Sequence, residues 1–121
     1  MKIAAYVAAA LTVLTAGMTF GETLTEQVIR LYAEGKYAEA EPIAKQFLVE
    51  TTQKYGPEHP ETATSLSRLA DLYGAQGKYD KAEPLYLRAL AIDEKALGPE
   101  HPGTASSLKN LALLYYFQGK Y

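Results

Sequence analysis

The stretch that decides the fold spans residues 77–102 and reads GKYDKAEPLYLRALAIDEKALGPEHP. The preceding stretch, residues 35–60, reads GKYAEAEPIAKQFLVETTQKYGPEHP and carries the same motifs in the same order. Aligning residues 35–76 with residues 77–118 gives 21 identities without a gap, and GKY occurs a third time at residues 119–121. Self-similarity at a fixed period of this length predicts a stack of repeated structural units.

Each unit contains two stretches with the apolar spacing of an amphipathic helix. In the first stretch the apolar positions fall at i, i+3, i+4 and i+7; they are Leu66, Leu69, Ala70 and Tyr73, repeated at Leu108, Leu111, Ala112 and Tyr115. The second stretch, residues 80–97, carries Ala82, Leu85, Tyr86, Ala89, Ile92 and Ala96. No strand pattern is found. The sequence therefore predicts an all-α fold, an α-solenoid of antiparallel helix-turn-helix repeats with two full units plus a half unit.

Glycine and proline mark the expected helix ends. Gly77 is expected to end the first helix of a unit with a sharp turn. Asp80 lies three residues before Glu83, which predicts a capping box at the start of the second helix. Pro57 and Pro60 are expected to stop and restart the chain between units.

These residues resemble the tetratricopeptide repeat family, and the 42-residue period with its GKYxxAEP turn and GPEHP loop is similar to the kinesin-light-chain-like subgroup. The resemblance rests on Leu66, Leu69, Ala70, Tyr73, Gly77, Tyr79, Ala82, Tyr86 and Ala89. It implies a repeat array over residues 22–121, with repeats at about 23–60 and 61–102 and a half repeat at 103–121. The first helix departs from the pattern, because Val28 replaces the small Ala and Leu31 replaces the Tyr.

Residues 1–21 have the order of a secretory signal peptide. Lys2 is followed by an apolar run over residues 3–16 and by small residues near Gly17 and Gly21, with no charge before Glu22. This order predicts cleavage between Met18 and Glu22 and export, to the bacterial periplasm or as a secreted protein. An Ala-rich first helix or an uncleaved anchor is the alternative, although the run is shorter than the roughly 20 residues of a spanning helix.

Composition excludes several classes of function. The chain has 12 basic and 14 acidic residues and a formal charge of −2, so it offers no basic surface for nucleic acid. It contains no Cys, which excludes disulfides and thiolate sites. His59 and His101 lie in equivalent loops, one to each loop, which does not make a metal-ligand set. No catalytic group, metal, cofactor or small-molecule substrate is expected.

In tetratricopeptide arrays the first helix of each unit lines a concave groove, so the resemblance implies a peptide groove here. The expected groove residues are Ser67, Arg68, Asp71, Lys109, Asn110, Leu113, Tyr116 and Phe117. Lys109 is followed one turn later by Leu113 rather than by an Asn, so a carboxylate-clamp type of groove is not supported. The alternative for these residues is an ordinary solvated helix face. Tyr73, Tyr79, Tyr86 and Tyr115 are expected to pack in the core.

The leading hypothesis is an exported, non-catalytic scaffold that binds a peptide or partner protein in the groove. A self-associating or truncated structural fragment of a longer exported protein is the second hypothesis, because the pattern places a further helix after Tyr121. A non-catalytic domain of an exported enzyme is the third. The resemblance names no partner.

Overall fold

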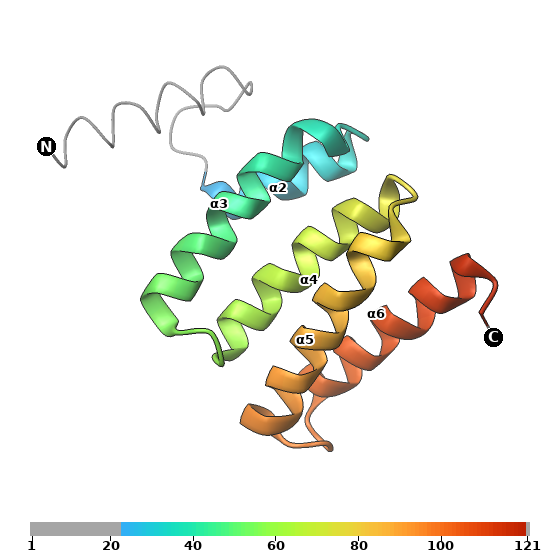
Figure 1. The fold of residues 1–121 in the computed structure, drawn as a ribbon. Helices are drawn as coiled ribbons and strands as arrows, with labels where there is room; N and C mark the ends of the chain where they lie inside the picture. Colours follow the sequence, from blue (N-terminus) through green and yellow to red (C-terminus); the bar gives the residue numbers. More distant parts are fainter. Residues whose placement is uncertain (1–22, 121) are drawn as a thin grey trace, which may run out of the picture.

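The computed structural model describes residues 23–120, and these form five helices in series. They are α2 (Leu24–Ala33), α3 (Tyr37–Tyr55), α4 (Pro60–Ala75), α5 (Tyr79–Leu97) and α6 (Pro102–Gln118). Helices α2 with α3 and α4 with α5 are antiparallel pairs, and α6 packs on α5 at the end of the row (Figure 1). No strand occurs in this part of the chain. The predicted all-α solenoid is confirmed.

The turn inside each unit is set by a glycine in the left-handed region. Gly35, Gly77 and Gly119 have φ angles of 75°, 74° and 74°. After Gly77, the Lys78 amide donates to the Tyr73 carbonyl at 2.8 Å, while the Gly77 amide donates to the Gly74 carbonyl at 3.0 Å. This is the Schellman motif, and the other two turns repeat it. A residue with a Cβ would be strained at this φ, so glycine is required.

The loop between units is also a repeated device. His59 is the N-cap of α4, where its Nδ1 accepts a hydrogen bond from the Glu61 amide at 3.1 Å. Pro60 follows at the first helical position, where no amide donor is needed. Thr62 Oγ1 then donates to the Gly56 carbonyl at 2.7 Å. The next unit repeats the arrangement with His101, Pro102 and Thr104. The two histidines are therefore helix caps.

The predicted capping box at Asp80 and Glu83 is wrong. Helix α5 begins at Tyr79, and its N-cap, Lys78, makes no side-chain capping bond. Lys78 ends the Schellman turn and is also the N-cap of α5. Asp80 therefore lies within the first turn of α5 and not before it. The capping box that does form is at Thr23 and Glu26, at the start of α2.

The core runs along the row of helices, and small residues lie where neighbouring helices pack on each other. Ala40, Ala70, Ala82 and Ala89 have no exposed surface, and they let neighbouring helices approach closely. Larger side chains fill the space around them, among them Leu31, Leu66, Leu72 and Ile92. Of the tyrosines expected in the core, Tyr73 and Tyr86 are buried and Tyr79 and Tyr115 are half-buried.

Within residues 23–120 no helix is both long and apolar enough to cross a membrane. The signal peptide predicted at residues 1–21 lies outside the described residues.

Candidate protein-binding groove

Helices α2, α4 and α6 line three hollows on the side of the row where the groove is expected. The main hollow, of about 390 Å³, lies against all three helices and the start of α3 and α5. A second, of about 190 Å³, lies between α2 and α4. A third, of about 300 Å³, lies between the N-terminal halves of α4 and α6. The first helix of each unit thus contributes to one continuous surface.

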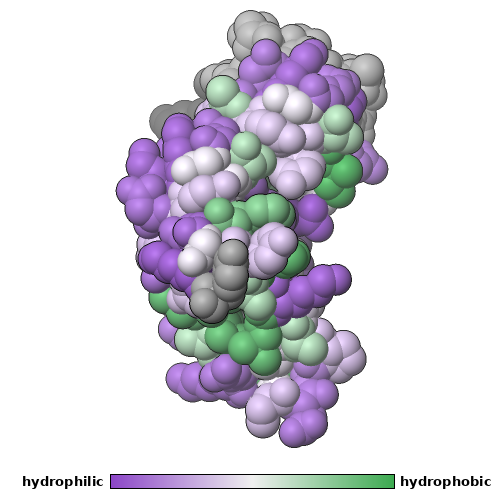
Figure 2. All heavy atoms as spheres, turned by 90° about the vertical axis from the view of Figure 1, so that its right-hand side faces the viewer, coloured by the Kyte–Doolittle hydropathy of each residue, from purple (hydrophilic) through white to green (hydrophobic). Residues whose placement is uncertain are grey.

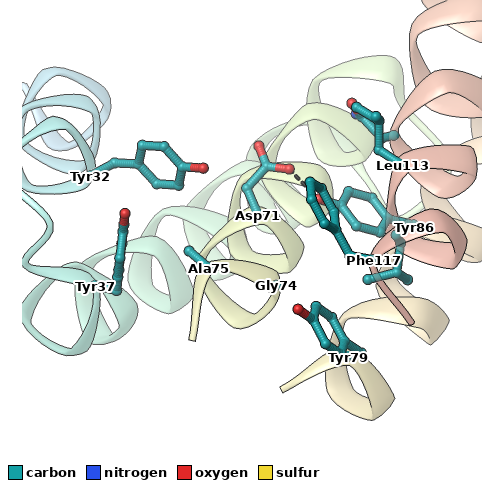
Figure 3. Close-up of a pocket in the computed structure, with 11 residues that line it drawn as sticks. Tyr32, Tyr37, Asp71, Gly74, Ala75, Tyr79, Tyr86, Leu113 and Phe117 are labelled. Atoms are coloured by element: carbon teal, nitrogen blue, oxygen red, sulfur yellow. Dashed lines mark hydrogen bonds between the residues drawn. The ribbon is translucent and has the colours of Figure 1, made fainter. Parts of the chain in front are cut away.

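The main hollow has an aromatic rim and a floor of small residues. Its rim contains Tyr32, Tyr37, Tyr79, Tyr86 and Phe117. Tyr32 and Tyr37 lie on one side, with their ring centroids 5.2 Å apart in an edge-on arrangement, and Phe117 and Tyr86 lie on the other (Figure 3). Gly74 and Ala75 of α4 lie between them.

The small floor is a departure from the repeat. Gly74 and Ala75 occupy the positions that Tyr116 and Phe117 hold in the next unit. A Cβ built on Gly74 would meet no atom within 4 Å, so the space above α4 is open. Gly74 therefore leaves open space at a position where the units on both sides carry tyrosine, Tyr32 and Tyr116.

Asp71 is the electrostatic centre of the groove, since it lines all three hollows. Its carboxylate accepts a hydrogen bond from the Tyr86 hydroxyl. Burial raises the pKa of Asp71, against the opposing effects of that hydrogen bond and of the Arg68 charge. The pKa of Tyr32 is also raised, first by burial and then by the negative charge of Asp71.

Arg68 lies one turn before Asp71 on α4 and lines the second and third hollows but not the main one. Its Nε atom is buried and has no hydrogen-bond partner in the described part of the chain. A buried donor without a partner costs free energy of about 1–3 kcal/mol. Because this atom is closed to solvent, a segment in the second or third hollow could accept hydrogen bonds only from the terminal guanidinium nitrogens of Arg68.

Six of the eight predicted groove residues line the hollows. Asn110, Leu113 and Phe117 line the main hollow with Asp71, and Ser67 lines the third hollow with Arg68 and Asp71. Lys109 and Tyr116 are exposed on α6 but are not among the residues that line these three hollows. Tyr116 contacts the Phe117 ring edge-on, with 5.7 Å between centroids.

Sequence reasoning missed the aromatic rim. Tyr32 and Tyr37 were not among the predicted groove residues, and Tyr79 and Tyr86 were assigned to core packing. Tyr32, Tyr37 and Tyr79 line the hollow from the end of α2 and the starts of α3 and α5, and Tyr86 lines it from within α5. The signal that could have found the hollow is Gly74, which stands where the other two units carry tyrosine on the face predicted to be concave.

The described residues contain no group of three or more His, Asp or Glu side chains that could hold a metal ion. The Nδ1 atoms of His59 and His101 accept capping hydrogen bonds, which occupies one ligand atom of each ring. These two side chains are therefore explained by helix capping.

Comparison with known proteins identifies the repeat. A family model described as a tetratricopeptide repeat matches residues 29–95 and 67–121. The matches overlap and together run from α2 to the end of the chain. No curated protein matches the sequence as a relative.

Proposed function

The chain belongs to the tetratricopeptide repeat family, whose repeats generally mediate protein–protein interaction and typically form non-catalytic scaffolds, and from that premise we propose that its groove binds an extended segment of a partner protein. The observation that carries the proposal is the row of hollows along α2, α4 and α6. Such a row suits a segment that places successive side chains in successive hollows. The 42-residue period favours the kinesin-light-chain-like subgroup within the family.

Two features of the groove favour polypeptide as the ligand. Arg68 and Asn110 lie at equivalent positions of α4 and α6 and both line the third hollow, so their donors can meet backbone carbonyls along one segment. Phe117, which is 65% exposed, lines the main hollow together with Asn110 and offers an apolar surface there. An exposed aromatic side chain next to hydrogen-bond donors is the pattern of an interface anchor.

The test is selection of binders from a displayed library of random peptides, followed by affinity measurement with groove variants. Arg68→Ala, Asn110→Ala and Phe117→Ala are each expected to weaken binding of a selected peptide at least fivefold. Asn110→Ala and Phe117→Ala should leave helicity and melting temperature nearly unchanged, because substitutions away from the core usually change the free energy of unfolding by less than about 0.5 kcal/mol. Arg68→Ala should not lower the melting temperature, because it removes a buried donor that has no hydrogen-bond partner in the described residues.

Arg88→Ala and Val49→Ala are the matched controls, since both residues are exposed and lie outside the three hollows. They should leave binding unchanged. Equal losses for groove and control variants, or a library that yields no binder, would contradict a groove function.

Self-association is the second candidate function, and the outer face of α6 favours it. Leu66 and Ala70 of α4 are fully buried under α5, but their counterparts on α6 are not: Leu108 is 48% exposed and Ala112 is also exposed. Apolar side chains lie among polar ones at this end of the molecule (Figure 2). Light scattering across concentrations tests it: a dimer lost in Leu108→Glu would support it, and a monomer throughout would rule it out.

We also propose that the chain is exported. The support is the uncharged, apolar order of residues 3–21 behind Lys2. Intact-mass analysis of the protein produced in a bacterial host should give a chain that begins between Met18 and Glu22. A full-length product in the cytoplasm would refute the proposal.

A further inference from the structure

The main hollow contains one unbalanced charge. Among the described residues that line it, Asp71 alone carries a formal charge at neutral pH. Within residues 23–120 Asp71 takes part in no ion pair, and its hydrogen bond comes from the neutral Tyr86 hydroxyl. Arg68 acts on Asp71 through space but faces the two neighbouring hollows. The carboxylate therefore lacks a direct cationic partner.

The walls around this charge are aromatic. Tyr32 and Tyr37 approach from one side and Tyr86 and Phe117 from the other, with Asp71 between them (Figure 3). The faces of Tyr and Phe rings attract cations, and the attraction increases as water is excluded. A half-buried carboxylate among aromatic rings is thus a site for a cation that also carries an apolar stem.

We propose that the main hollow binds the side chain of a Lys or Arg residue of the partner segment, with its alkyl stem against the rings and its cationic head at Asp71. The proposal rests on the groove function above and specifies the chemistry of its ligand. The volume of about 390 Å³ lies within the range of roughly 300–1,000 Å³ typical of small-ligand pockets. Gly74 carries no side chain, and the space above it is open to a side chain of the partner.

Other side chains fit the hollow less well. An acidic side chain would bring a second negative charge beside Asp71, which is repulsive and strongly so away from water. A purely apolar side chain would remove water from the carboxylate without providing a partner, and burying an unpaired charge is costly. A basic side chain is the class that satisfies both the rings and the charge.

The test uses small probes that do not depend on finding a partner. Chemical-shift changes in the full chain are followed while N-acetyl-arginine methylamide is added, and then its neutral isostere N-acetyl-citrulline methylamide. The arginine probe should shift the Gly74 amide and the signals of Tyr32 and Phe117, and its dissociation constant should be at least threefold lower than that of the citrulline probe.

Two variants test whether the preference for the arginine probe arises at Asp71 in the main hollow. Asp71→Asn keeps an oxygen that accepts from Tyr86, so it should fold normally and remove the preference for arginine over citrulline. Gly74→Tyr adds a ring at a lining position of the hollow and should abolish both sets of shifts. Asp80→Asn, at an exposed carboxylate outside the hollow, is the matched control and should retain the preference.

Equal binding of arginine and citrulline, stronger binding of N-acetyl-glutamate methylamide, or no shift at the hollow would overturn the proposal. Each of these results leaves the groove function open to its own peptide test. Peptides that bind the groove but place apolar or acidic residues at Gly74 would likewise refute this inference alone.

Discussion

At the scale of single residues, two polar side chains, Asp71 and Gln27, differ in whether their buried atoms have hydrogen-bond partners. Asp71 has a hydrogen bond from Tyr86 and an opening towards the groove, and burial raises its pKa. Gln27 of α2 is fully buried, and neither its amide nitrogen nor its amide oxygen has a hydrogen-bond partner in the described part of the chain. The proposed groove function gives Asp71 a role, whereas the structure shows no contact among the described residues that would compensate the burial of the Gln27 amide.

Gln27→Leu is expected to stabilise the protein. Leu69 and Leu111 occupy the equivalent positions of the two following units, so leucine is the residue that the repeat itself uses there. A buried polar group without a partner costs about 1–3 kcal/mol, and the free energy of unfolding in urea should rise by a similar amount. Gln53→Leu, at an exposed position of α3, should change it by less than about 0.5 kcal/mol. A loss of stability in Gln27→Leu would show that the amide has a partner.

At the scale of elements, two kinds of connection alternate along the chain, one inside each unit and one between units. The glycine turn connects the two helices of a unit, and the His-Pro cap starts the next unit. Side chains tie neighbouring units as well: Thr51 Oγ1 donates to Ser65 Oγ at 2.8 Å, and Ser107 Oγ donates to Asp93 Oδ2 at 2.6 Å at the equivalent place. Each junction between units is therefore held by a His-Pro cap and by one buried polar contact.

The histidine caps lead to a direct prediction. His59→Ala and His101→Ala should each lower the free energy of unfolding by about 1 kcal/mol, the usual cost of losing an N-cap. His59→Asn and His101→Asn should retain most of the stability, because an Asn oxygen can accept the same amide proton. Urea denaturation of the four variants provides the measurement.

Comparing His59 with His101 distinguishes the contribution of capping to stability from the contribution of ring stacking. His59 stacks on Tyr55 with centroids 4.7 Å apart, whereas Leu97 occupies the Tyr55 position beside His101. If Asn were no better than Ala at position 101, capping would be excluded as the reason for histidine there.

The fold class could be predicted because a 42-residue repeat and helical apolar stripes report on local structure. The start of α5 could not be placed from Asp80 and Glu83, since the preceding Schellman turn decides it. Six of the residues expected on the groove face line the hollows, because helical spacing fixes the face on which they lie; that they bind a segment stays a prediction. The aromatic rim could not be predicted, because apolar spacing assigns Tyr86 to the core without showing that its hydroxyl meets Asp71 of another helix.

At the scale of the whole molecule, the array is a row in which each helix packs chiefly on its neighbours in sequence. The outer face of α6 carries the apolar stripe that α5 covers on α4, although Leu111 within that stripe is already buried. The turn at Gly119 has the same geometry as the turn at Gly77, and Lys120 lies 3.9 Å from Glu83 just as Lys78 lies 3.9 Å from Glu41. The turn after α6 therefore has the same geometry as the turns that lead into α3 and α5.

Appending a copy of residues 80–97 after Tyr121 is expected to raise the melting temperature by several degrees. The added helix would cover Leu108 and Ala112, and burial of apolar surface contributes about 25 cal/mol per Å² before the entropy of ordering is subtracted. The matched control replaces the counterparts of Ala82 and Ala89 in the added helix with Glu, which prevents close packing. Equal melting temperatures for the two extended proteins would show that the outer face of α6 does not accept a helix.

The neighbour-to-neighbour packing also has a mechanical consequence. Because almost all contacts join helices adjacent in the row, a pulling force applied to its two ends passes through the joints in series. Such a row should extend at low force by peeling helices away from one end, rather than by a single rupture of the whole molecule. A bound segment that spans α2, α4 and α6 would join those helices in parallel, so the protein should become stiffer when its groove is filled.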